Sequence, residues 1–427
     1  MWVAAGFIAG PIAMGIVGIF MLLFGQKEWT EQLIIGFLFM LILSDSLSEP
    51  LAFAKSFKNI YIIFLSFYVI ARRDIFDYSS TLHKYFLPFL FFAVVGIAFS
   101  PQPDIAIQKT LSYFLLLWIV PNYLVTSFQR EGVTFLRNMV LFMFTICAAG
   151  YLLGFISPET AYSHGARFRG IFGNPNGMGV FLLMFTIFFH IVRKKFPELF
   201  TRHELIIIYL SILFFVFLTG SRNALLSILL FFMFSYFFRI STILGFIIFM
   251  VVIVLTEYIT ANFVSFVGSL GLSEELRVET LKEGSGRLVA WKFAWDEINR
   301  SLFIGRGMGY DEYYMRKNAT VLLQLGHEGG VHNSYLILWL NTGLLGFISF
   351  FIAFFTLFIR ASLTSKLAFP AMIAVMFSIN FEPWLAASLN PYTIILLCSL
   401  TLILHPVFDA EVPETTNEIT EENTLVA

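Results

Sequence analysis

The chain has 427 residues, of which 58% are hydrophobic, 18% aromatic and only 13% charged. Soluble globular proteins carry about 25% charged residues, so this composition excludes an ordinary water-soluble enzyme and indicates a membrane protein with many spans. The formal net charge of −1 hides an acidic end, because residues 409–427 hold six acids and no base. We expect this segment to be a disordered, solvated cytoplasmic tail without a function of its own.

A transmembrane helix needs about 20 predominantly apolar residues. The apolar runs predict an all-α bundle of 12 or 13 transmembrane helices that forms one domain over residues 1–408. The first run has no basic flank before it and no small-residue cleavage site after it, which favours a retained helix over a removed signal peptide. The predicted helices cover residues 2–24, 33–50, 59–71, 85–99, 110–127, 134–157, 177–193, 204–219, 222–238, 241–257, 334–359, 367–385 and 390–405.

Basic residues in the short connections set the orientation, because loops rich in Lys and Arg stay in the cytoplasm. The clearest marker is the connection 193–202, RKKFPELFTR. Placing it inside also puts the basic turns near residues 72–73, 130, 239 and 360–366 in the cytoplasm. Three segments then lie outside: residues 158–176, the turn at 220–221, and the long loop 258–333.

The loop 258–333 is the only connection long enough to hold structure of its own, and such loops are often functional. Its stretch GSGRLVAWKFAWDEINRSLF predicts an amphipathic helix, since apolar residues recur at steps of three and four. These residues are Leu288, Trp291, Trp295, Ile298 and Leu302. The two tryptophans favour a helix that lies on the membrane interface or against the bundle.

Arginines of the outer face stand at predicted helix starts. Ser285 is a natural N-cap that places Arg287 in the first turn of the loop helix, and Ser221 does the same for Arg222. The same face carries further arginines, two of them before the turn NPNG that opens a membrane helix and one in the stretch GRGMG: Arg167, Arg169 and Arg306.

A cation at a helix N-terminus is unfavourable by roughly 0.3 to 1 kcal/mol, so several on one face suggest a common reason. A bound anion would make each of them favourable, because arginine forks and N-terminal N–H groups both suit phosphate. The alternative is that these arginines extend to lipid headgroups. We favour an anion site, with Arg306 as its weaker member.

The helix predicted over 334–359 is preceded by a histidine. Asn333 or Ser334 can cap this helix, which leaves His332 just outside it at the membrane surface, where an imidazole can take a proton. The alternative is an interfacial histidine bonded to the backbone, and His327 and Glu328 are rival bases. We assign function to His332, with Asn333 beside it.

Two glycines follow in the same helix. Along a straight helix, Gly343 and Gly346 would lie about 17 and 21 Å from His332. That is too deep for chemistry at the membrane surface, so we expect these glycines to permit close helix packing.

These motifs resemble the O-antigen ligase and polymerase superfamily of bacterial envelope glycosyltransferases. The family motif has His, then Asn, Ser or Gln, then nine residues, Gly, two variable positions and Gly, and the matching residues are His332, Asn333, Gly343 and Gly346. Gly286 and Arg287 match the Gly-Arg element of the family's long outer loop, and TGSRNALL, RGIFGNPNGMG and GRGMG also look like family elements. The motifs cover residues 160–350, whereas the first 150 residues match only in being apolar helices.

The resemblance implies transfer of a glycan from an undecaprenyl-pyrophosphate carrier to an acceptor hydroxyl, in O-antigen or surface polysaccharide biosynthesis at the outer face of the bacterial cytoplasmic (inner) membrane. It implies no metal, cofactor or nucleotide sugar. The sequence has no HExxH, Asp-x-Asp or clustered Cys and His spacing, and Cys147 and Cys398 lie inside apolar runs.

The implied chemistry assigns a role to each candidate residue. Arg287 and Arg222 would bind the pyrophosphate and stabilise the charge that develops on it, and Arg169 would support them or the first sugar. His332 would deprotonate or orient the acceptor hydroxyl.

A lipid-linked glycan flippase or another transporter is the main alternative, because transporters use ionisable residues in the membrane and Asp45, Glu49 and Glu382 lie in or beside apolar runs. An inactive scaffold would not require arginines at helix starts. The acceptor is a growing glycan, a lipid anchor or a protein, and the sequence leaves these three open. We expect the bilayer and polysaccharide-assembly proteins as partners, and no nucleic acid.

Overall fold

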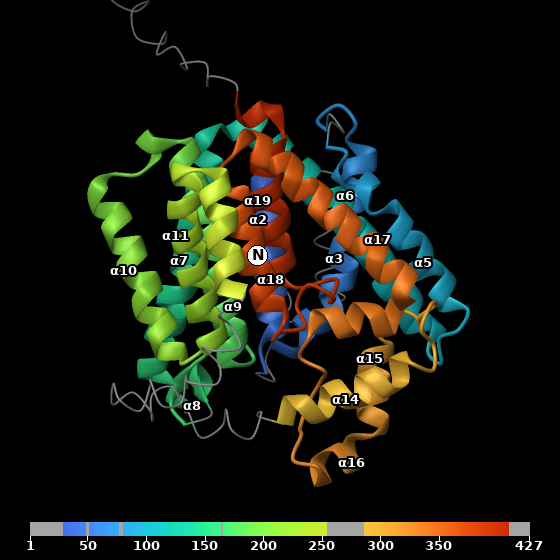
Figure 1. The fold of residues 1–427 in the computed structure, drawn as a ribbon. Coiled ribbons are helices and arrows are strands. Elements are labelled where there is room, and N and C mark those ends of the chain that lie inside the picture. Colours follow the sequence, from blue (N-terminus) through green and yellow to red (C-terminus); the bar gives the residue numbers. More distant parts are fainter. Residues whose placement is uncertain (1–28, 48–50, 77–79, 164, 254–285, 410–427) are drawn as a thin grey trace, which may run out of the picture.

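The computed structural model describes residues 29–47, 51–76, 80–163, 165–253 and 286–409. Four predictions lie outside the described residues: the helix 2–24, the loop before Gly286, the Ser285 cap and the tail 410–427. The described part is a helical bundle (Figure 1). Its only strands are β1 (Tyr162–Ser163) and β2 (Arg167–Phe168), which pair antiparallel in a short hairpin.

Seven described helices are long and apolar enough to cross a membrane: α3 (Ala52–Ala71), α6 (Pro103–Glu131), α7 (Val133–Ile156), α9 (Pro175–Lys195), α10 (Arg202–Thr219), α11 (Arg222–Ile240) and α17 (Ser334–Thr364). Other apolar helices pack among them: α2 (Thr30–Asp45), α5 (Leu87–Ile97), Thr242–Ile253, α18 (Ala368–Ile379) and α19 (Pro391–Leu404). Every predicted run from 33–50 onward contains a helix, which confirms the polytopic all-α class.

The remaining described helices are short or lie in the connections. Those of the long loop are α14 (Arg287–Ile298), α15 (Tyr310–Lys317) and α16 (Ala319–Gln324). The others are α4 (Leu82–Tyr85), α8 (Pro158–Ala161), η3 (Pro197–Leu199) and η5 (Pro406–Phe408).

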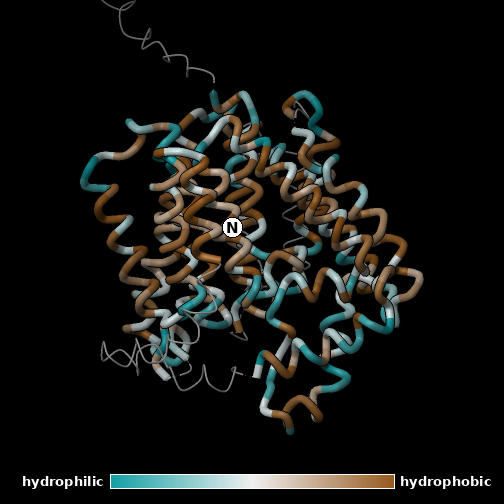
Figure 2. The backbone as a smooth tube through the Cα atoms, in the orientation of Figure 1, coloured by the Kyte–Doolittle hydropathy of each residue, from teal (hydrophilic) through white to brown (hydrophobic). Residues whose placement is uncertain are grey.

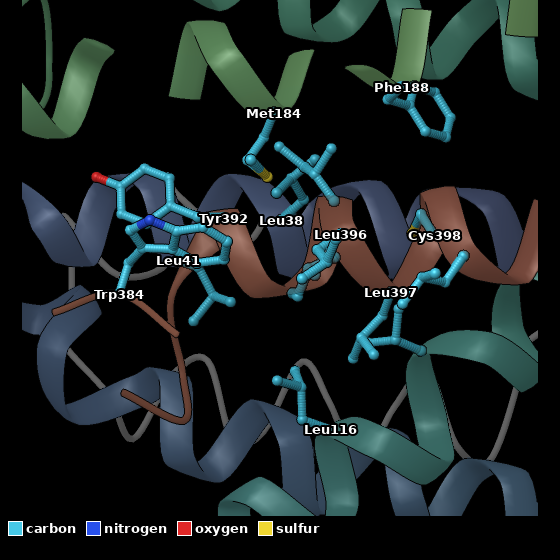
Figure 3. Packing of buried hydrophobic residues seen from close by; sticks show 14 of the residues in the cluster. Leu38, Leu41, Leu116, Met184, Phe188, Trp384, Tyr392, Leu396, Leu397 and Cys398 are labelled. Carbon is cyan, nitrogen blue, oxygen red and sulfur yellow. The ribbon is translucent and has the colours of Figure 1, made fainter. Parts of the chain in front are cut away.

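The centre of the bundle is formed by α9 and α19. Leu396, Leu397 and Cys398 of α19 pack between side chains of α2, α6 and α9 (Figure 3). The outer helices instead expose large apolar side chains such as Phe91 and Leu210. Brown, hydrophobic backbone therefore fills the middle of the bundle while teal gathers at its ends (Figure 2), as expected of helices that face lipid.

The connections segregate to two faces. On one face, Lys195 pairs with Asp409 (2.7 Å), and Thr364 and Lys366 at the end of α17 donate to the carbonyls of Ile403 (3.2 Å) and Arg239 (3.2 Å). Three of the predicted basic connections, at residues 193–202, 239 and 360–366, therefore lie together there. The opposite face, which we name the loop face, carries residues 158–176, 219–221, 286–333 and 380–390 (Figure 1). The assignment of the loop face to the cell exterior stays a prediction.

Polar caps begin the helices that start on the loop face. The side chain of Asn174 accepts from the backbone N–H of Gly177 at the start of α9, and Ser221 caps α11 in the same way. At the start of α19, Asn390 accepts from Thr393. Such caps satisfy N–H groups that have no partner within their own helix.

The prediction of one continuous helix over residues 334–359 is wrong in one respect. The helix α17 is interrupted at Gly343, whose backbone is not helical (φ 71°, ψ 177°). The first part, residues 334–342, runs along the loop face, and the second part crosses the bundle in another direction (Figure 1). A β-carbon on Gly343 would lie 2.3 Å from the Phe303 carbonyl oxygen, so glycine is required there. The predicted depth of Gly343 in the membrane therefore does not hold, whereas its assignment to close packing is confirmed.

The predicted loop helix is confirmed as α14, but its buried face differs from the predicted one. Leu288 and Trp295 are 63% and 43% exposed, whereas Ala290 and Ala294 are fully buried. Of the predicted apolar face, Ile298 is fully buried and Trp291 and Leu302 are partly buried, so the prediction holds in part. The small side chains of Ala290 and Ala294 add to this face and allow α14 to approach the first part of α17 closely.

The predicted helix 367–385 is also too long. α18 ends at Ile379, and residues 380–390 form a non-helical segment before α19. Pro383 lies in this segment and cannot supply a helical N–H. The segment carries Glu382 to the loop face.

Candidate functional site

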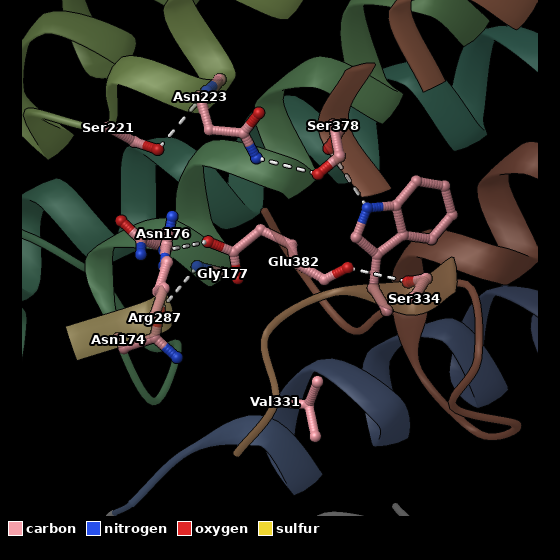
Figure 4. A network of polar contacts seen from close by, with 12 residues as sticks. Asn174, Asn176, Gly177, Ser221, Asn223, Arg287, Val331, Ser334, Ser378 and Glu382 are labelled. Carbon is pink, nitrogen blue, oxygen red and sulfur yellow. Dashed lines mark hydrogen bonds and ion pairs between the residues drawn. The ribbon is translucent and has the colours of Figure 1, made fainter. Parts of the chain in front are cut away.

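Four helix N-termini converge around the segment 380–390 (Figure 4). They belong to α9, α11, α14 and the first part of α17. Asn223 of α11 donates to the carbonyl of Ser378 (3.1 Å), and Ser334 of α17 donates to the carbonyl of Glu382 (2.7 Å). Helix N-termini carry positive potential and unsatisfied N–H groups, so their convergence favours negative charge at this place.

Arg287 is the first residue of α14, as predicted. Its guanidinium lies 3.3 Å from the Glu382 carboxylate and 5.9 Å from the ring centre of Phe381. The Arg287 side chain is 25% exposed, whereas that of Glu382 is 9% exposed. Arg287 is therefore a partly accessible cation whose resident partner is a buried carboxylate.

The start of α14 is fixed close to the histidine loop. Gly286 caps the helix with φ 71°, and a β-carbon there would lie 2.6 Å from the Gly326 carbonyl oxygen. The indole of Trp291 donates to the carbonyl of Val331 (3.0 Å). These contacts bring Arg287 beside the residues that precede α17.

Glu382 is held from several sides. Asn176, near the start of α9, forms a side-chain hydrogen bond to its carboxylate (Figure 4). Arg167 donates to the Asn176 side-chain oxygen (2.9 Å), which orients the amide nitrogen of Asn176 toward Glu382. Burial raises the pKa of Glu382 to about 7, although Arg287 and Asn176 act in the opposite direction.

His332 has a left-handed backbone (φ 50°), and its Nδ1 is buried without a hydrogen-bond partner among the described residues. Burial and, after it, the positive charge of Arg287 and the nearby His327 lower the pKa of His332 to about 4. His332 is thus neutral near pH 7 and can accept a proton. Within the part of the chain that the structure describes, the Nδ1 atom of His332 therefore has no protein partner that would compete with a bound hydroxyl.

The rival bases are placed less favourably. The ring of His327 lies 6.3 Å from that of His332, and its Nε2 lies 3.1 Å from the Gly330 carbonyl oxygen. Glu328 is exposed on the loop.

The other predicted residues divide into two groups. Arg167 contacts the site directly, since it bonds Asn176 and the carbonyl of Thr219 (2.7 Å). Arg222 is the first residue of α11, whose start lies beside the site. Asn333 caps α17 by accepting from Leu336 (3.1 Å).

Arg169 and Arg306 are engaged in other contacts. Arg169 donates to the carbonyls of Glu159, Thr160 and Gly173, which ties the loop 158–176 together. Arg306 lies 3.8 Å from Glu297, which is ten residues, or about 15 Å, along α14 from Arg287. The structure therefore does not bring Arg306 into the same site.

Two residues of this site are absent from the predicted set. From the sequence, Glu382 is only an acid beside an apolar run, and Asn176 is only part of a turn. A signal for Glu382 exists, because a charged residue followed by proline inside an apolar run marks an interrupted helix. Among the described residues, no group of three or more His, Cys, Asp and Glu side chains could hold a metal ion.

Fold and site together define a multi-pass helical membrane protein with a guanidinium and a neutral imidazole at converging helix starts. Residues 206–351 match the family model described as O-Antigen ligase, which confirms the predicted resemblance to the O-antigen ligase and polymerase superfamily. The matched stretch contains Arg222, Arg287 and His332, whereas Asn176 and Glu382 lie outside it. No curated protein matches the chain.

Proposed function

We propose that this protein is a glycosyltransferase that acts on its loop face, outside the cytoplasm, and transfers a glycan from an undecaprenyl-pyrophosphate carrier to an acceptor hydroxyl. The proposal rests chiefly on one relationship, the accessible Arg287 fork beside the neutral His332 at converging helix N-termini. The family match supports the reaction class.

In the proposed step, the acceptor oxygen forms a bond to the anomeric carbon of the donor sugar. The bond from that carbon to the phosphate oxygen breaks, and the electron pair leaves with the lipid diphosphate. Arg287 stabilises the charge on this leaving group, and the positive potential of the helix N-termini acts in the same direction. His332 receives the proton of the acceptor hydroxyl.

Glu382 has a defined part in this scheme. The donor diphosphate and the Glu382 carboxylate compete for the same N–H groups of the Arg287 guanidinium, so donor binding displaces Glu382 from Arg287. Asn176 then keeps a hydrogen bond to Glu382, since the amide of Asn176 is oriented independently by Arg167. The diphosphate adds negative charge beside Arg287, which offsets the effect of this guanidinium on His332 and raises the pKa of His332 above that of the donor-free protein, so the imidazole is a stronger base once the donor is bound.

The remaining candidate residues differ in how directly they would contact the donor. We infer that Arg222 faces the diphosphate from the start of α11. Arg167 and Arg169 support the site through Asn176 and the loop backbone, and Asn333 supports it as the cap of α17. Arg306 has no contact with the donor in this scheme.

The direct test uses purified protein in lipid nanodiscs with a glycan linked to undecaprenyl pyrophosphate. We expect mass spectrometry to find a new glycosidic bond and released undecaprenyl pyrophosphate, and we expect Arg287→Lys and His332→Ala to slow the formation of both products strongly. In sealed vesicles, a flippase would instead move the intact donor across the bilayer. Transport without chemical change, or wild-type transfer rates in both variants, would overturn the proposal.

The acceptor is identified by the glycan that a deletion strain accumulates. Loss of a polymerase leaves single repeat units, and loss of a ligase leaves long polymer on its lipid carrier. Loss of a protein glycosyltransferase leaves the target protein unmodified.

A further inference from the structure

The break in α17 is filled by a segment of the loop. In a continuous helix, Leu344 and Leu345 would donate to the carbonyls of Leu340 and Asn341. Here Leu344 and Leu345 donate to Leu302 (2.9 Å) and Phe303 (3.4 Å). The carbonyls of Leu340 and Asn341 accept instead from the two residues Arg306 (3.3 Å) and Gly307 (2.9 Å). The segment 302–307 thus satisfies both sides of the break.

One side-chain pair closes this junction. The Asn341 side-chain oxygen accepts from the backbone N–H of Asp311 (3.0 Å), and its amide nitrogen donates to the Asp311 carboxylate (2.9 Å). Asn341 is 2% exposed. A buried amide with both of its polar atoms engaged fixes the relative position of the two segments.

The junction also holds the far end of α14. Buried Glu297 accepts from the hydroxyl of Tyr310 (2.7 Å) and pairs with Arg300 (3.1 Å). Tyr310 directly precedes Asp311, so the end of α14 and the break in α17 meet at one place. At their other ends, α14 and the first part of α17 begin with Arg287 and Ser334, and Trp291 of α14 bonds Val331 just before α17. The two helices therefore run side by side from the site to the junction.

We propose that the Asn341 and Asp311 pair is a clamp that positions Arg287 relative to His332 from the opposite end of this helix pair. Both residues are positioning residues, because neither contacts Arg287 or His332. The inference rests on the proposed function for its link to catalysis, but the clamp itself is a structural property of the loop.

The clamp is tested by exchanging the side chains of Asn341 and Asp311, singly and together. Asp311→Asn preserves an oxygen acceptor for Asn341, so we expect near wild-type transfer. Asn341→Asp sets two carboxylates against each other, and we expect kcat/KM to fall at least about tenfold, the cost of one repulsive buried polar pair. In the double variant Asp311→Asn/Asn341→Asp the amide of residue 311 donates to the new carboxylate, and activity should return to near the level of Asp311→Asn.

A distance measurement separates the clamp from the reaction. Spin labels at Lys292→Cys on α14 and Ile352→Cys on the second part of α17 react at exposed sites, whereas the native Cys147 and Cys398 are buried. We expect Asn341→Asp to broaden the distance distribution and the double variant to narrow it again.

The two measurements separate failure of the clamp from failure of the proposed function. An unchanged distribution in Asn341→Asp, or a double variant as broad and as inactive as that single variant, would overturn the clamp. Wild-type protein that transfers no glycan would instead overturn the proposed function, and the distance result would still decide the clamp.

Discussion

The Glu382 carboxylate lies 3.3 Å from the Arg287 guanidinium. The arginine that we propose binds the donor diphosphate is therefore already paired with a carboxylate of the protein. Burial raises the pKa of Glu382 to about 7. Below this pH the carboxyl is protonated and competes weakly for Arg287, and above it the carboxylate competes strongly. The diphosphate of a lipid-linked donor keeps its charge throughout this range.

This competition predicts that the KM for the donor depends on pH. We expect the wild-type KM to rise about fivefold between about pH 6 and about pH 8, as Glu382 loses its proton. Glu382→Gln should show a low KM without this rise, because the amide carries no charge at any of these pH values. Initial rates at varied donor concentration measure the effect.

Glu198→Gln is the matched control, since Glu198 is an exposed acid in η3, between α9 and α10 and away from the loop face. It should retain the wild-type pH profile. The same rise in KM in Glu382→Gln as in the wild type would contradict the exchange of carboxylate and diphosphate on Arg287.

The sequence predicted Arg287 and His332 because both adjoin helix starts, and polar or glycine residues mark such starts locally. It could not predict the partners of these two residues. Asn176 and Glu382 lie in distant parts of the chain, and only the packing of α9 against α19 brings them together. The partners of Arg169 could not be predicted for the same reason, since the carbonyls that accept from it become neighbours only when the loop around it folds.

The break in α17 shows a second limit of local patterns. The stretch HNSYLILWLNTGLLG is apolar enough to be one helix, and its two glycines suggest close packing as readily as a break. Its conformation is decided by the segment 302–307, which replaces the missing helical hydrogen bonds. Hydrophobic periodicity reports which residues avoid water, whereas tertiary hydrogen bonds decide where a helix is interrupted.

Replacement of Arg287 by lysine tests the guanidinium fork while keeping the charge. We expect kcat/KM to fall about 100-fold, since two charge-assisted hydrogen bonds to the diphosphate become one. Arg316→Lys is the control, because Arg316 is exposed on α15 and its Nε bonds only to a carbonyl of its own helix. Equal rates for both lysine variants would show that Arg287 acts by charge alone.

The imidazole is tested apart from the guanidinium. His332→Ala should lower kcat at least about 100-fold, the range of general-base catalysis, and leave the donor KM nearly unchanged. The exposed His203 supplies the control variant His203→Ala, which should be fully active. A large rise in donor KM with constant kcat in His332→Ala would place His332 in donor binding instead.

The coupling between these two residues gives a prediction that requires no turnover. Arg287 helps to lower the pKa of His332 to about 4, so Arg287→Gln should raise that pKa. Acylation of His332 by diethyl pyrocarbonate requires the neutral ring, and its pH midpoint, followed on the His332 peptide by mass spectrometry, should therefore move upward. An identical midpoint in both proteins would mean that Arg287 is electrostatically remote from His332.

Substitution of Gly343 tests whether the break in α17 depends on the backbone conformation of this residue. An alanine at φ 71° is strained, and its β-carbon would press on the Phe303 carbonyl, so Gly343→Ala should lower the free energy of unfolding by about 2 to 3 kcal/mol. Gly330→Ala is the control, because a β-carbon at that position would have no described atom within 4 Å. Denaturant unfolding in detergent measures both.

The activity of the same variant carries the argument further. If the strain is relieved by straightening α17, the segment 302–307 loses its partners at Leu340 and Asn341, and the loop helix that carries Arg287 loses its support. Gly343→Ala should then fall in activity more than its stability loss explains, while retaining its helical circular dichroism. Wild-type stability and activity in Gly343→Ala would mean that the break is not needed to hold Arg287 beside His332.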